Sequence, residues 1–135
     1  MKITPVAMLF DMDGTITDPR KPITPEVLEV LSSLPNDIKK HLVTGSDMEK
    51  VEEQMSTAVL LSIFDRVYTC NGTRVFNCNL DMDDETRAIE PELIHKVSLT
   101  DHYSSADLNH IISVLLKIAS ETHTKVKTGT FVEWR

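Results

Sequence analysis

The chain has 135 residues, of which 41% are hydrophobic and 26% charged, as is typical of one modest globular domain with an apolar core. Its formal net charge of −7 argues against nucleic acid or an anionic membrane as a partner. Because no apolar run could span a membrane and the first residues lack a signal-peptide pattern, we expect a cytoplasmic protein whose two cysteines, Cys70 and Cys78, are reduced.

Strands and helices alternate in the first part of the chain. Residues 6–10 form an apolar run that predicts a strand, and this run ends at Asp-Met-Asp-Gly. A helix is predicted from Thr24, which supplies a cap ahead of a proline and a glutamate, to Leu34. Its buried face is predicted to consist of Val27, Leu28, Val30, Leu31 and Leu34. A second strand is predicted around residues 41–43, directly before Thr-Gly-Ser. The order favours a parallel sheet with crossover helices.

The next segment continues this pattern. Ser46 and Glu49 fit a capping box, which predicts a helix from Ser46 to about Met55. A short helix over 58–63, a strand over 66–69, an Asn-Gly turn and a partner strand over 74–76 follow.

The character of the chain changes after about residue 80. An acidic run over 81–85 is interpreted as a solvated connector, and an extended segment is predicted after it. The apolar spacing that follows predicts a helix over 104–121. A final strand is predicted over 126–135. We therefore predict two domains, residues 1–80 and residues 81–135.

Two aspartates, Asp11 and Asp13, follow the first strand, where an open parallel sheet binds its ligands. An Asp-Gly pair after a strand is often only a turn. Here a second strand ends in Thr-Gly-Ser, which favours a site. One carboxylate could attack phosphorus and form an aspartyl-phosphate, while the other protonates the leaving oxygen.

The phosphate itself needs positive groups around it. Two carboxylates repel a phosphate dianion, so this chemistry requires Mg²⁺ to offset that repulsion. Gly14 allows a sharp turn whose backbone amides can hold phosphate oxygens. Ser46 adds a hydroxyl at a predicted helix N-terminus.

Asp-Met-Asp-Gly-Thr followed by Thr-Gly-Ser about thirty residues later resembles the first two motifs of the haloacid dehalogenase (HAD) superfamily. Four stretches are similar to eukaryotic-type phosphomannomutases, in order and over nearly the whole chain: FDMDGTITDPRKPIT, TGSDMEKVEEQM, FDRVYTCNGT and KTGTFVEWR. The resemblance implies an α/β fold with a HAD-like, Rossmann-type parallel sheet core and the start of an α+β cap domain.

The resemblance also implies a role for each matching residue. Asp11 would be the phosphorylated nucleophile and Asp13 the general acid and base, with Mg²⁺ held by the Asp11 carboxylate and the Asp13 carbonyl oxygen. Gly45 and Ser46 would bind the transferred phosphoryl group, and Arg20 would contact the sugar phosphate. The implied reaction interconverts mannose 6-phosphate and mannose 1-phosphate for GDP-mannose synthesis, with a hexose 1,6-bisphosphate as activator. A homodimer through the cap is also implied.

The resemblance places this chain in the N-terminal part of such a protein. The family's third-motif lysine and fourth-motif acids are not in these 135 residues, so we expect this chain alone to be nearly inactive. Two alternatives remain open: a sugar-phosphate phosphatase of the same superfamily, and a non-catalytic remnant that has kept its motifs.

Overall fold

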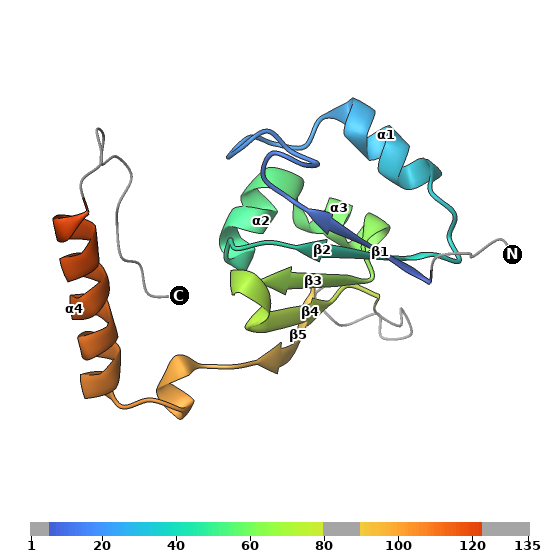
Figure 1. Ribbon diagram of the computed structural model, residues 1–135. Helices are drawn as coiled ribbons and strands as arrows, with labels where there is room; N and C mark the ends of the chain where they lie inside the picture. Colours follow the sequence, from blue (N-terminus) through green and yellow to red (C-terminus); the bar gives the residue numbers. More distant parts are fainter. Residues whose placement is uncertain (1–5, 80–89, 123–135) are drawn as a thin grey trace, which may run out of the picture. The chain divides into compact units, whose positions relative to one another are not determined.

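The fold is built around one five-stranded sheet, shown in Figure 1. A computed structural model describes residues 6–79 and 90–122. The strands are β1 (Ala7–Asp11), β2 (Lys39–Val43), β3 (Arg66–Thr69), β4 (Arg74–Asn77) and β5 (Glu92–Lys96). They lie in the order β1-β2-β3-β4-β5.

The pairing changes direction within the sheet. β1, β2 and β3 are parallel, whereas β4 is antiparallel to both β3 and β5. Parallel neighbours need crossover connections, and helices supply them here. The prediction of an α/β fold with a parallel core is therefore confirmed, and the antiparallel strands extend that core at one side.

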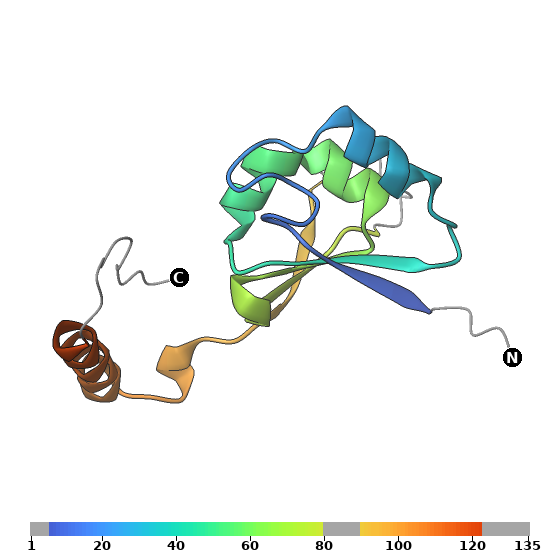
Figure 2. The ribbon, with the colours of Figure 1, turned by 45° about the horizontal axis from the view of Figure 1, so that its top comes forward.

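Three helices connect the parallel strands. They are α1 (Pro25–Ser33), α2 (Met48–Met55) and α3 (Thr57–Ile63). Figure 2 shows all three on the same face of the sheet. Thr24 caps α1 and Ser56 caps α3, each accepting a hydrogen bond from a backbone amide three residues later.

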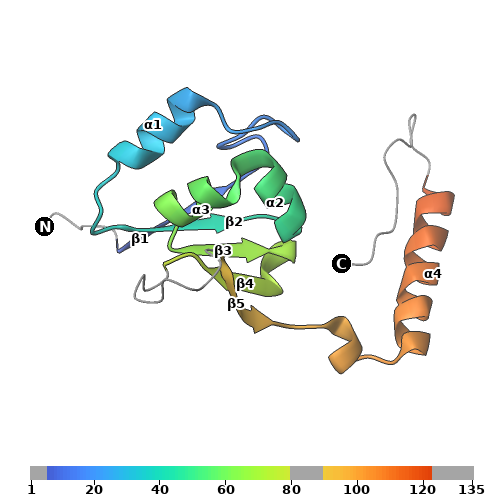
Figure 3. The ribbon, with the colours of Figure 1, turned by 180° about the vertical axis from the view of Figure 1, so that it is seen from behind.

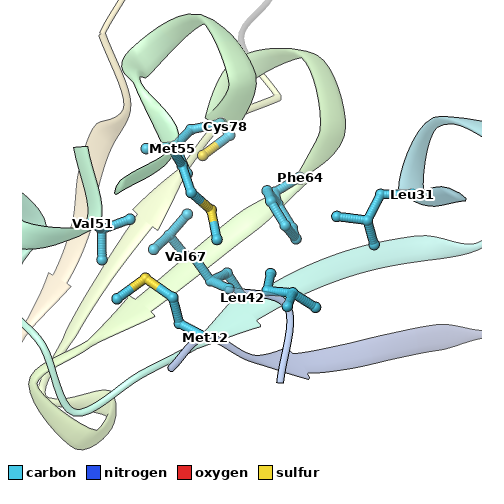
Figure 4. Close-up of a cluster of buried hydrophobic side chains, with 10 residues drawn as sticks. Met12, Leu31, Leu42, Val51, Met55, Phe64, Val67 and Cys78 are labelled. Carbon is cyan, nitrogen blue, oxygen red and sulfur yellow. The ribbon is translucent and has the colours of Figure 1, made fainter. Parts of the chain in front are cut away.

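The core lies between these helices and the sheet (Figure 4). Its buried members come from every parallel strand or its end and from each of the three helices. They are Met12, Ile16, Leu31, Leu42, Val51, Met55, Leu60, Phe64, Val67 and Cys78. Within α1 the sequence pattern is wrong at one position, because Val30 is 61% exposed and only Leu31 is fully buried.

The molecule divides into two compact units between Lys96 and Val97. Strand β5 belongs to the first unit because it pairs with β4. The domain boundary predicted near residue 80 lies in 80–89, outside the described residues, as do the acidic run and the strand predicted over 126–135. The assignment of residues 81–135 to a separate domain stays a prediction.

The second unit contains the 3₁₀ turn η2 (Leu99–Asp101) and the helix α4 (Ser105–Glu121). Ser104 caps α4 through a capping box with Asp107, close to the predicted start. In the ranges that the structure describes, no helix combines the length and apolarity needed to cross a membrane.

Candidate active site

Met12, the residue between the two aspartates, is completely buried in the core, whereas the residues on either side of it are more accessible. Asp11 is exposed and Asp13 is partly exposed. The amides of Thr15, Ile16 and Thr17 all donate to the Met12 carbonyl oxygen, at 3.2, 3.1 and 3.0 Å. A compact turn therefore follows the strand and holds both carboxylates at its carboxyl end.

Each carboxylate is fixed by one hydrogen bond within this loop. Thr15 Oγ1 donates to Asp11 Oδ2 at 3.0 Å. The backbone amide of Arg20 donates to Asp13 Oδ1 at 3.0 Å. No hydrogen bond from the described residues reaches the second oxygen of Asp11, so that oxygen can face a ligand.

The second predicted motif lies at the adjacent strand end. Asp11 and Val43 are register partners in the parallel pair, so Gly45 and Ser46 leave the sheet beside the aspartates. Figure 3 shows β2 and β3 ending at the same edge of the sheet, next to α2. Gly45 is exposed and Ser46 is partly exposed, so both can reach a ligand at this edge.

The predicted cap of α2 is wrong by one residue. Asp47, and not Ser46, is the N-cap, and its Oδ1 accepts from the Lys50 amide at 3.0 Å. The reason is tertiary: Ser46 is held outside the helix because its amide donates to Thr44 Oγ1 and its carbonyl accepts from the Cys70 amide. The Ser46 hydroxyl is therefore not used for capping.

The third strand brings an additional residue to this edge. The turn η1 (Cys70–Gly72) follows β3, and the amides of Cys70 and Asn71 donate to Ser46 and Thr44 carbonyl oxygens at 2.9 and 3.1 Å. A Cβ atom added to Gly45 would lie 3.1 Å from Asn71 Oδ1. Asn71 was predicted only as part of a turn, and its place beside Gly45 has no signal in the sequence.

This turn has an unusual backbone. Cys70, Asn71 and Gly72 have φ values of 50°, 56° and 88°, three left-handed residues in succession. Left-handed backbone costs an ordinary residue about 1–2 kcal/mol. The two hydrogen bonds to the Thr-Gly-Ser segment offset part of that cost.

Two of the residues with shifted pKa values, Cys78 and Asp65, lie at the opposite edge of the sheet, where β2 and β3 begin. Burial raises the pKa of the Cys78 thiol to about 12, and the charge of Asp65 adds to the shift. Burial acts to raise the pKa of Asp65 too, but hydrogen bonds from Lys39 Nζ (2.7 Å) and the Lys40 amide (2.9 Å) outweigh it and lower that pKa. These groups stabilise the fold and are remote from the aspartates.

The donors near Asp11 fit a hard divalent cation. Carboxylate and carbonyl oxygens are the ligands that Mg²⁺ prefers, and Asp11 and Asp13 supply both kinds at an exposed strand end. Within residues 6–79 and 90–122, no group of three or more His, Cys, Asp or Glu side chains gathers to form a complete metal site. A cation held by the two aspartates would therefore need its remaining ligands from water, substrate or other segments.

The predicted site residues come together in two groups. Asp13 and Arg20 are joined through the Arg20 backbone, although the exposed Arg20 guanidinium has no recorded partner among the described residues. Gly45 and Ser46 lie at the neighbouring strand end. The roles predicted for these five residues, Asp11 included, stay predictions.

An α/β sheet with a parallel core, Asp-x-Asp at the end of its first strand and Thr-Gly-Ser after its second defines a protein of the HAD class. The family model described as "Eukaryotic phosphomannomutase" matches residues 27–135. The chain belongs to this family.

Individual relatives support the assignment. The chain is 34% identical over 134 residues to a phosphomannomutase of Galdieria sulphuraria, which covers 99% of this chain and 48% of the relative. It is 32% identical over 130 residues to the phosphomannomutase of Triticum aestivum, covering 96% of this chain and 47% of the relative. It is 33% identical over 128 residues to the phosphomannomutase of Dendrobium officinale, and the match covers 95% of this chain and 46% of the relative. The chain spans about half the length of the curated relatives it matches.

Proposed function

We propose that this chain carries the nucleophile and the acid–base group of a phosphomannomutase, which interconverts mannose 6-phosphate and mannose 1-phosphate for GDP-mannose synthesis. The observation that carries the proposal is the pair of separately fixed carboxylates at the end of β1. Thr15 holds one oxygen of Asp11, and the Arg20 amide holds one oxygen of Asp13. Membership of the phosphomannomutase family supports the choice of reaction.

The two carboxylates divide the chemistry between them. The free oxygen of Asp11 attacks phosphorus, forming an Asp11–phosphate bond as the bond from phosphorus to the sugar oxygen breaks. Asp13 gives its proton to the departing sugar oxygen. A hexose 1,6-bisphosphate starts the cycle by transferring one phosphoryl group to Asp11. Asp13 then takes the proton from the free hydroxyl of the bound mannose monophosphate as that hydroxyl accepts the phosphoryl group from Asp11, and a mannose 1,6-bisphosphate forms. The attack described above on the other phosphorus of this bisphosphate releases the isomeric monophosphate and leaves Asp11 phosphorylated again.

Three further residues bind the substrate in this proposal. The Ser46 hydroxyl and the exposed backbone at Gly45 hold the phosphoryl group, and the Arg20 guanidinium pairs with the phosphate of the sugar. Asp11 and the Asp13 carbonyl oxygen would hold Mg²⁺, which would supply positive charge to neutralise the phosphoryl oxygens. We further propose a cytoplasmic location, which two free, buried cysteines favour, and a homodimer.

The test measures two products from one incubation. The full chain is incubated with Mg²⁺, mannose 1-phosphate and glucose 1,6-bisphosphate, while mannose 6-phosphate and inorganic phosphate are followed separately. We expect mannose 6-phosphate at a slow rate, together with a borohydride-reducible acyl phosphate on Asp11. Asp11→Asn should abolish both signals. Asp18→Asn, a change at an exposed aspartate of the same loop, should leave them unchanged.

The other outcomes distinguish the alternatives. Inorganic phosphate released without any need for the bisphosphate would identify a sugar-phosphate phosphatase. An absence of acyl phosphate, combined with Mg²⁺ binding that is the same in the Asp11→Asn variant, would identify a non-catalytic remnant.

A further inference from the structure

Two polar side chains are buried behind the loop that carries Asp13. Thr17 is 5% exposed and Gln54 is 8% exposed, although the surrounding core is apolar. Thr17 belongs to the loop after β1, and Gln54 lies in the last turn of α2. Thr17 Oγ1 donates to Gln54 Oε1 at 3.1 Å. A buried hydrogen bond of this kind is costly to break, because the partner left behind has no water to replace it.

The loop is attached to α2 at a second point. The Ile23 amide donates to the Gln54 carbonyl oxygen at 2.9 Å, so one residue of α2 holds the loop through its side chain and through its backbone. In the views of Figures 1 and 3 the loop runs beside α2, in agreement with these bonds. Residues 18–22 between the two attachments are all exposed. The path of residues 18–22 is therefore set by the attachments at its two ends, since none of these residues is buried.

The contact to Asp13 comes from this exposed stretch. Arg20 must adopt a left-handed backbone, with φ of 60°, in order to point its amide at Asp13 Oδ1. That conformation is unfavourable for an arginine, and it persists only where the surrounding structure holds it. The attachments at Thr17 and Ile23 lie on either side of Arg20 and supply this restraint.

We propose that Gln54 is a positioning residue that orients the Asp13 carboxylate, acting through Thr17 and the backbone of Arg20. The effect of Gln54 on catalysis rests on the proposed function, in which Asp13 moves the proton. The claim that Gln54 maintains the Arg20–Asp13 hydrogen bond is independent of that function.

The test uses the backbone amide proton of Arg20 as a probe in the full chain. An amide proton that donates to a carboxylate resonates downfield of one that makes no such bond. ¹H–¹⁵N spectra recorded at one neutral pH should therefore place the Arg20 amide proton downfield of its position in Asp13→Ala, and this difference is the Arg20 shift. We expect Gln54→Met and Thr17→Val to reduce this shift by more than half. Thr17→Ser, which keeps the hydroxyl, and Glu53→Ala, at an exposed neighbour on α2, should preserve it.

The Gln54 and Thr17 variants separate an effect on the Asp13 carboxylate from an effect on the whole fold. In Gln54→Met the Thr17 hydroxyl still has the Met12 carbonyl oxygen at 3.1 Å as an acceptor, so the fold should survive. A full Arg20 shift in both Gln54→Met and Thr17→Val would overturn the proposal. General loss of spectral dispersion in both would also overturn it, since the pair would then be holding the fold and not the carboxylate.

Turnover gives an independent reading. Where the mutase activity is present, Gln54→Met should lower kcat on the order of tenfold with little change in KM, because the proton transfer and not substrate binding is impaired. A chain without turnover would count against the proposed function, whereas the Arg20 shift would still test the role of Gln54.

Discussion

Replacement of Gly45 by alanine tests the close approach between the ends of β2 and β3. The new Cβ atom would lie 3.1 Å from Asn71 Oδ1, whereas ordinary contacts fall between 3.4 and 4 Å. Overpacking costs about 1–3 kcal/mol in a rigid core, and the low end applies here because Asn71 is an exposed side chain that can rotate. Alanine also restricts the unfolded chain, which stabilises by about 0.4–1 kcal/mol where the backbone permits it.

The two effects separate when Asn71 is removed. We expect Gly45→Ala to destabilise the protein by up to about 0.6 kcal/mol in the native background, given a contact cost of about 1 kcal/mol and the opposing entropy term. In an Asn71→Gly background the contact is gone, so the same change should stabilise by about 0.4–1 kcal/mol. The coupling between the two sites is therefore expected to be about 1 kcal/mol.

Urea unfolding followed by far-UV circular dichroism on the four members of this cycle measures the coupling. Gly14→Ala is the matched control: Gly14 has φ of 79° but no atom within 4 Å of an added Cβ, so its cost arises from the backbone alone. That cost, about 1–2 kcal/mol, should be the same in both backgrounds. A coupling below about 0.3 kcal/mol between Gly45→Ala and Asn71→Gly would refute the reasoning.

Three other predictions concern stability and thiol reactivity. Asp47→Ala should destabilise the protein by about 1 kcal/mol through loss of the α2 cap. Ser46→Ala should have a smaller effect in the same urea titration. A larger effect of Ser46→Ala would indicate that Ser46 is the cap. Because the pKa of Asp65 is lowered in the folded protein, its contribution to the free energy of unfolding should be complete above the ordinary pKa of about 3.9 and be lost as the pH falls. The difference in stability between the native protein and Asp65→Asn should therefore shrink from about pH 6 to about pH 3. A difference that does not change with pH would contradict this. Burial raises the pKa of Cys78 to about 12, so in a Cys70→Ser background this thiol should react with iodoacetamide only when the protein is unfolded in urea. Mass spectrometry of the labelled protein measures this. Rapid labelling of the native protein would mean that the Cys78 thiol is not buried.

The sequence was most informative where local signals were strong. β3 and α4 occur almost where the patterns predicted them, because an apolar strand bounded by turns and a capped helix with regular spacing leave few alternatives. Strand β5 was predicted only as an extended segment. All five of its residues are exposed, so it has no alternation to detect, and its pairing with β4 fixes it.

The candidate site shows the same division. Asp11, Asp13 and the Thr-Gly-Ser segment could be predicted because a strand end and a motif mark them. The choice between Ser46 and Asp47 as the cap could not, since both are good capping residues and the Cys70 amide decides between them. Gln54 is one polar residue in a helix, and only the folded loop reveals what it contacts.

The order of the strands has a consequence for how the sheet could grow. In the described sheet β1 and β5 are the two edge strands, and β1 exposes an unpaired row of backbone groups on the side away from β2. Because parallel crossovers are right-handed, a further parallel strand added beside β1 would carry its helix to the opposite face from α1, α2 and α3. The direction of winding would then reverse next to Asp11, which makes the end of β1 the topological switch point and opens a crevice there between the two layers of helices.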